Sequence, residues 1–244
     1  MAGSGRTEEL APKDAYLTEA EGSVLSAIDG GLVLDRTVFY ARGGGQPGDV
    51  GIIRWDGGEI EVLDTVRKDG LPFHVVAEGA ALPGPGTLVH GTIDWDRRYR
   101  TMRTHTALHA LSGVVFRDFG AKVTGGNMEP GVARMDFELD GISVEFGQEV
   151  ERKLNDELVR GYPTEVVYLA RQEALKDPDL IRTKVNLIPE WVDEIRVVDI
   201  VGLDRQADGG THVASTLEVG QVRVVKTESK GKANKRMRIE LAGH

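Results

Sequence analysis

The stretch His105-Thr-Ala-Leu-His109 has a later counterpart in Asp208-Gly-Gly-Thr-His212, and each carries two potential metal ligands four residues apart. On a helix, that spacing places both imidazoles of the first stretch on one face, one turn apart. It is the spacing that two histidines need to share one zinc ion. The glycine pair of the second stretch predicts a tight loop instead of a helix. Such a loop can bring Asp208 and His212 to the same ion as the first pair.

The sequence around the first pair predicts a helix. Thr101 or Thr104 is suited to cap its start, and Gly120 stands where a helix ends. Apolar residues recur at a near-helical period between these points: Leu108, Leu111, Val114, Val115 and Phe119. Thr106 stands where a metalloprotease motif requires glutamate as the base, which excludes that class. The alternative is that two histidines share a helix by chance, and only the second pair favours a metal site over that interpretation.

Composition limits the location and the partners of the chain. The 244 residues carry a net charge of −9 and no cysteine, so a disulfide framework is excluded and a cytoplasmic location is expected. No apolar run approaches the length of a membrane span. The acidic balance argues against nucleic-acid binding over the whole surface, so such a partner must meet local basic patches. One patch leads into the predicted helix: Arg97, Arg98, Arg100 and Arg103. A second, lysine-rich patch near the C-terminus is equally consistent with a solvated face.

The pattern of elements predicts an α+β protein with two domains. Residues 1–92 consist of short alternating apolar runs separated by glycine, which is typical of a small antiparallel β-barrel-like domain. Asp56-Gly57 and Asp69-Gly70 indicate hairpin turns there. Residues 93–244 mix helical and strand patterns, which predicts helices on an antiparallel sheet. The metal ligands all fall in this second domain.

These motifs carry a resemblance to a known family. His105–His109, followed by the segment from Asp208 to Gly220, resembles the editing module of alanyl-tRNA synthetase and its free-standing relatives, the AlaX proteins. Upstream, Thr37-Val-Phe-Tyr-Ala-Arg-Gly-Gly-Gly-Gln-Pro-Gly-Asp49 is similar to the family's glycine-rich motif. Two positions depart from the family pattern. Asp208 stands where the family usually has cysteine, and Leu108 stands where many synthetase members have threonine. Aspartate is a competent zinc ligand, but it is harder and less discriminating than a thiolate.

The resemblance implies an enzyme, an aminoacyl-tRNA deacylase that hydrolyses mischarged tRNA(Ala), chiefly Ser-tRNA(Ala). It implies one zinc or other divalent ion bound by His105, His109, Asp208 and His212. The arginine patch is then expected to contact tRNA phosphates. The loop formed by Gly43, Gly44, Gly45 and Gln46 is a further candidate for tRNA binding through its backbone N–H groups, with an ordinary tight turn as the alternative.

Discrimination against alanine requires a group that recognises the serine hydroxyl. Thr124, in the glycine-rich segment from Lys122 to Asn127, is the candidate for this part of the catalytic site, because its hydroxyl both donates and accepts. An ordinary turn threonine is the alternative. Two other functions stay open for the whole chain: a non-catalytic tRNA-binding module with a structural metal, and a zinc hydrolase acting on another ester or amide.

Overall fold

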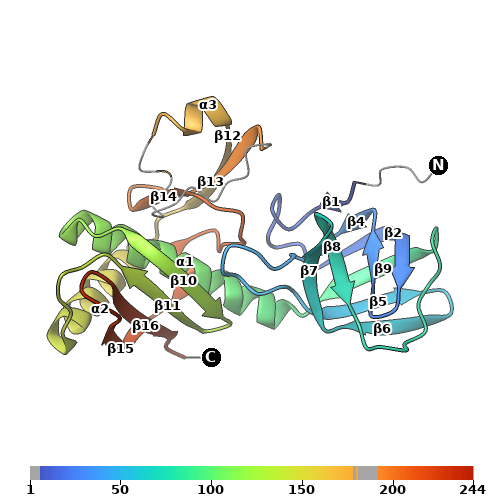
Figure 1. Cartoon of the computed structure of the whole chain (residues 1–244), viewed down its shortest axis with the longest axis horizontal. Helices are drawn as coiled ribbons and strands as arrows, with labels where there is room; N and C mark the ends of the chain where they lie inside the picture. Colours follow the sequence, from blue (N-terminus) through green and yellow to red (C-terminus); the bar gives the residue numbers. More distant parts are fainter. Residues whose placement is uncertain (1–5, 178–179, 181–191, 244) are drawn as a thin grey trace. The chain divides into compact units, whose positions relative to one another are not determined.

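One long helix, α1 (Trp95–Phe119), begins in one compact unit of the chain and ends in another. The computed structural model describes residues 6–177, 180 and 192–243. Its two units are Met1–Arg100 and Thr101–His244, so the division falls inside α1. The domain boundary predicted at residues 92 and 93 lies just before this helix. Figure 1 shows the elements along the chain. No helix in the described residues has the length and apolar content needed to cross a membrane.

The first unit is built from short strands. Its strands are β1 (Glu8–Glu9), β2 (Glu19–Ile28), β3 (Gly31–Leu34), β4 (Arg36–Thr37), β5 (Gly51–Trp55), β6 (Gly58–Val62), β7 (Asp64–Lys68), β8 (Leu71–Val75) and β9 (Leu88–Ile93). Seven of them form one antiparallel sheet in the order β6-β5-β9-β2-β3-β8-β7. The sheet curls around an apolar core that includes Leu32, Phe39 and Ile53 (Figure 1). The predicted antiparallel β unit is confirmed.

The two predicted hairpin turns are present. Asp56-Gly57 joins β5 to β6, and Gly57 has a φ of +112°. Asp69 and Gly70 join β7 to β8 with φ values of 52° and 81°. In the second turn, positive φ at both central residues matches the twist of the flanking strands, which is the reason that Asp-Gly is frequent in such turns.

The second unit combines helices with two antiparallel sheets, so the α+β prediction is confirmed. Its remaining elements are β10 (Val123–Glu129), β11 (Val132–Phe137), α2 (Val144–Leu158), β12 (Thr164–Ala170), α3 (Arg171–Ala174), β13 (Glu194–Ile200), β14 (Asp204–Ala207), the 3-10 helix η1 (Thr216–Val219), β15 (Val222–Ser229) and β16 (Lys235–Leu241). The sheet orders are β10-β11-β16-β15 and β12-β13-β14. Ser143 caps α2, whose Gly147 lies against β15.

The helix α1 begins earlier than the sequence indicated. Asp94 caps it, since its carboxylate accepts from the backbone N–H of Arg97 at 3.0 Å. Thr101 and Thr104 are buried inside the helix, and the Thr104 hydroxyl instead accepts from the N–H of Gly131. The end agrees with the prediction, because Gly120 follows the last helical residue with a φ of +67°.

Arg98 has a structural environment that the sequence did not indicate. Its side chain is fully buried in the first unit, where the guanidinium forms an ion pair with Asp49. It also donates to the carbonyls of Ala15 and Val38, each at 2.9 Å. Asp49 in turn accepts from the N–H of Tyr40. All these partners are internal, so the prediction that Arg98 contacts tRNA phosphates is wrong. The residue anchors the start of α1.

Replacing Arg98 with methionine should destabilise the protein strongly. The substitution leaves Asp49 charged and buried without its partner, and removing one member of a buried pair typically costs about 3–5 kcal/mol. The free energy of unfolding in urea measures this loss. Arg54→Ala is the matched control, because Arg54 forms an exposed pair with Glu59 and such pairs contribute only about 0–1 kcal/mol. Equal losses in the two variants would contradict the anchoring function.

Candidate metal centre

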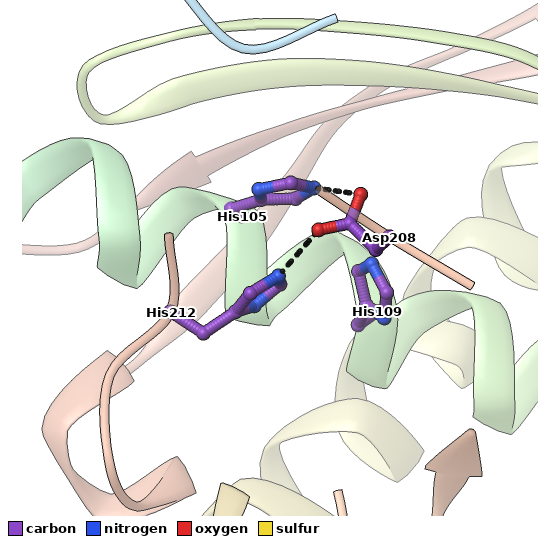
Figure 2. Close-up of side chains that lie close together, drawn as sticks. All are labelled: His105, His109, Asp208 and His212. Carbon is purple, nitrogen blue, oxygen red and sulfur yellow. Dashed lines mark hydrogen bonds and ion pairs between the residues drawn. The ribbon is translucent and has the colours of Figure 1, made fainter. Parts of the chain in front are cut away.

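Four predicted ligands lie together in the second unit. The available ligand atoms of His105, His109, Asp208 and His212 all fall within 4.8 Å of one another. His105 Nε2 is 3.6 Å from Asp208 Oδ1, and His212 Nε2 is 3.0 Å from Asp208 Oδ2. Figure 2 shows the four side chains pointing toward one another. A tetrahedral ion with bonds of about 2 Å needs a set of this composition and compactness.

Each pair reaches the site from a different kind of element. His105 and His109 are one turn apart on α1, and their ring centroids are 5.2 Å apart. Asp208 and His212 come from the loop that follows β14. The Asp208 carboxylate accepts from the N–H of Gly210 at 2.6 Å, which closes a tight turn. This is the glycine loop expected from the sequence.

Two histidines are oriented by groups behind them. His109 Nδ1 is 3.0 Å from a carboxylate oxygen of Asp204, which is itself buried. A carboxylate at Nδ1 fixes the tautomer and leaves Nε2 as the ligand atom. His212 Nδ1 lies 3.2 Å from the hydroxyl of Thr106, and that hydroxyl also accepts from the N–H of Val213. Both outer contacts have the form found around metal-binding histidines.

The contact between Asp204 and His109 depends on a close approach of α1 to the β13–β14 turn. A Cβ atom at Gly113, one turn beyond His109, would lie 2.6 Å from the carbonyl oxygen of Leu203 and 3.1 Å from Cβ of Asp204. Only glycine allows the two backbones this separation. Gln206 completes the contact by donating to Asp204 at 2.7 Å.

Besides His212 and Gly210, Asp208 contacts Arg196 of β13. The Arg196 guanidinium donates to the Asp208 carbonyl at 2.9 Å and lies 3.9 Å from its carboxylate. The backbone N–H of Asp208 donates to the Arg196 carbonyl at 3.1 Å. These contacts extend the pairing of β13 and β14 by one residue and fix the direction in which the carboxylate points.

The site favours neutral imidazoles. Burial lowers the pKa of His105 well below its usual value, and the neighbouring histidines and Arg196 lower it further against the opposing effect of Asp208. Burial also lowers the pKa of His212 to about 4. Both rings are therefore uncharged at neutral pH, and the neutral ring is the form that binds a metal ion.

Other predicted site residues lie in environments that bear on their functions. Arg103 donates through Nε and Nη2 to the carbonyl of Val219, at 3.2 and 2.9 Å, and so binds the end of η1. Gly43 and Gln46 hydrogen bond to each other across a turn in the first unit, in which Gly44 and Gly45 have positive φ. The tight turn is therefore present, and tRNA binding by this loop stays a prediction.

The environment of Thr124 differs from the one assumed. Serine recognition was expected from a buried hydroxyl beside glycines that leave space for a substrate, but Thr124 lies on β10 and is exposed. Its hydroxyl donates to the side-chain carbonyl of Asn234 at 2.9 Å. The Thr124 hydroxyl is exposed and already bonds to Asn234, so it would not be left without a hydrogen bond when the substrate carries alanine in place of serine. The physical basis for serine recognition by Thr124 is therefore lost.

Sequence reasoning missed the groups that orient the ligands. Asp204, Arg196 and Gly113 have no spacing relation to the histidines, because strand register and helix packing bring them there. Thr106 was considered only as a departure from a protease motif. No local signal in the sequence marks Asp204 as the partner of His109.

Comparison with known proteins identifies the family of the chain. The chain is 38% identical over 236 residues to the alanyl-tRNA editing protein AlaX-M of Saccharolobus solfataricus, covering 95% of this chain and 97% of that protein. It is 37% identical over 240 residues to AlaX-M of Methanosarcina barkeri, covering 96% and 99%. The chain belongs to the AlaX-M family. Its members are matched from end to end, whereas alanine–tRNA ligase of Pyrobaculum aerophilum is 40% identical over 233 residues that make up 25% of that protein.

Two family models match separate segments of the chain. The model of class II (A) tRNA synthetases matches residues 14–97, and the model of the second additional domain of threonyl- and alanyl-tRNA synthetases matches residues 195–238. The second match contains Asp208 and His212 together with Asp204 and Arg196. The ligands His105 and His109 lie between the two matched segments.

Replacing His109 with alanine should remove most of the bound divalent ion. The change deletes one expected ligand and removes the imidazole that the buried Asp204 carboxylate contacts. Elemental analysis of freshly purified protein measures the metal content per chain. Asp204→Asn keeps the ligand and weakens only its orientation, so we expect a reduced affinity, within the ten- to hundred-fold range typical of such outer partners. Full metal retention by His109→Ala would exclude this residue as a ligand.

Proposed function

We propose that this chain hydrolyses the ester bond of mischarged tRNA(Ala), chiefly Ser-tRNA(Ala). One observation carries the proposal: end-to-end similarity to proteins named as alanyl-tRNA editing proteins, with a compact four-ligand cluster in the chain. A second hydrolytic site is physically required for such fidelity. A synthetic pocket shaped for alanine cannot strongly reject an analogue that adds only a hydroxyl. The substrate also favours a cytoplasmic location, which imaging of a tagged chain would test.

We propose zinc as the ion held by the cluster. Three imidazoles and one carboxylate suit zinc, although the carboxylate makes the site less selective than a thiolate would. Bound there, the ion supplies a positive charge that orients and polarises the ester. Elemental analysis identifies the ion, and another metal at full occupancy would contradict zinc.

The direction of substrate approach follows from the exposure of the ligands. The Asp208 side chain is 13% exposed, compared with 5% for His105, 9% for His109 and 2% for His212. The histidines are thus enclosed by α1 and the loop, and the ester is best able to approach beside Asp208. In this arrangement Gly210 holds the Asp208 carboxylate and Arg196 holds the Asp208 backbone. Asp204 and Thr106 keep two of the imidazoles oriented.

Purified protein should deacylate Ser-tRNA(Ala) much faster than the spontaneous reaction, and should leave Ala-tRNA(Ala) largely intact. Release of labelled amino acid from the two substrates measures both rates. Gly-tRNA(Ala) serves as a third substrate, to measure the preference for serine. His109→Ala is the inactive control.

The outcomes separate the three candidate functions. Binding of tRNA without any ester cleavage would indicate a non-catalytic module with a structural metal. Cleavage of simple esters without a preference for aminoacyl-tRNA would indicate a hydrolase for another substrate. Either result overturns the proposal.

We propose that Arg97 and Arg100 contact tRNA phosphates near the acceptor end. They are three residues apart on α1 and so project from the same side of the helix. Arg97→Ala and Arg100→Ala should each weaken tRNA binding and lower the salt dependence of log K by about one unit or less. Titrations at several salt concentrations measure the slope. Arg152→Ala, an exposed arginine of α2, is the control. An unchanged slope in the double variant would place the tRNA elsewhere.

A further inference from the structure

A cross-strand row links the metal centre to the edge of the three-stranded sheet. Tyr168 of β12 lies directly opposite Arg196 of β13. Arg196 is in turn bonded to Asp208 through the backbone, one step beyond the pairing of Val197 with Ala207. Residues opposite each other in antiparallel strands project from the same face. Tyr168, Arg196 and Asp208 therefore form one row on one face, and the tyrosine lies about 10 Å from the ligand.

Only part of this sheet face is covered. The helix α1 covers it at β13 and β14, where Val198 and Ile200 are fully buried and Gly113 lies against the β13–β14 turn. Arg196 is 10% exposed. On β12 the cover ends, since Tyr168 is 50% exposed and Val166, two residues before it on the same face, is 41% exposed.

The exposure of Tyr168 is fixed by the register of the strand. Its neighbours Val167 and Leu169 pack against Ile195 and Val197 on the opposite face of the sheet. Moving Tyr168 to that face would expose both apolar neighbours. The ring is thus held on the same face of the sheet as the candidate metal site, two strand spacings from Asp208.

We propose that Tyr168 is the stacking platform for the terminal adenine of the tRNA, with Val166 extending its apolar surface. The inference rests on the proposed function, because it places the ester of that same nucleotide beside Asp208. A row about 10 Å long matches the reach of one nucleoside from its base to its esterified ribose. An exposed aromatic ring binds any base through its face, while a phosphate or an amino acid would require charged or polar groups. Tyr168 is a positioning residue, since it contacts the base and not the reacting atoms.

The proposal is tested by a binding cycle that does not depend on hydrolysis. One probe is an uncharged tRNA(Ala) transcript, and the other is the same transcript without its terminal adenosine. Loss of the stack should weaken binding about ten-fold. Wild-type protein should therefore bind the shortened transcript about ten-fold more weakly. Tyr168→Ala should bind the full transcript as weakly as the wild-type protein binds the shortened one. Its affinity should not fall further when the terminal adenosine is absent. Glu165→Gln, on the opposite face of β12, should retain the wild-type difference.

Conservative variants separate stacking from other contributions of the side chain. Tyr168→Phe keeps the flat ring and should behave as wild type, whereas Tyr168→Leu keeps only apolar bulk and should resemble Tyr168→Ala. A full ten-fold difference between the two transcripts in Tyr168→Ala overturns the proposal, even if the protein deacylates Ser-tRNA. If the four affinities follow the expected pattern but the wild-type protein cleaves no ester, the stacking proposal stands and only the proposed hydrolysis is overturned. A Tyr168→Phe variant as weak as Tyr168→Ala would assign the contact to the hydroxyl and also overturn stacking.

Discussion

The close approach of α1 to the β13–β14 turn is the contact on which the candidate metal site depends. It is made by backbone, with Gly113 on one side and the Leu203 carbonyl on the other. The approach sets Asp204 against His109 and so fixes the ring of one ligand. The approach also fixes where β14 begins. The loop that follows β14 therefore starts close enough to α1 to bring Asp208 and His212 to the two helical histidines. Two ligand pairs far apart in the sequence are thereby joined through a position with no side chain.

Charge balance is compatible with aspartate at position 208, where the family pattern expected from the sequence has cysteine. The charged side chains around the cluster, among the described residues, include the buried carboxylate of Asp204, the largely buried carboxylate of Asp208 and the guanidinium of Arg196. A thiolate and a carboxylate carry the same charge, so the exchange leaves this balance unaltered. What changes is the softness of one ligand and the number of oxygen atoms that it offers. The N–H of Gly210 donates to one carboxylate oxygen of Asp208, and Arg196 donates to its backbone carbonyl, so the carboxylate has a defined direction.

The sequence predicted those features that follow from local spacing. The pair His105 and His109 requires only a helix, and the Asp-Gly hairpins require only positive φ, so both could be derived from neighbouring residues. Thr124 could not be placed in the same way. Its glycine neighbours are equally compatible with a turn, but pairing of the segment with β11 makes it a strand, and Thr124 lies at the register shift between Val123 and Gly125. The groups behind the ligands depend on register between distant strands, which no single-sequence pattern contains.

The arginines of α1 show most clearly what composition cannot decide. Four of them lie within seven residues, and as a group they indicate a phosphate-binding patch. Successive helical positions face different surroundings, however, since each residue turns about 100° from the last. Arg98 faces inward to Asp49, and Arg103 faces the Val219 carbonyl at the end of η1. Both charges hold the helix to its surroundings, one in each unit of the chain. A count of basic residues therefore overstates the charge that a nucleic acid can meet, and burial determines which of those residues are available to it.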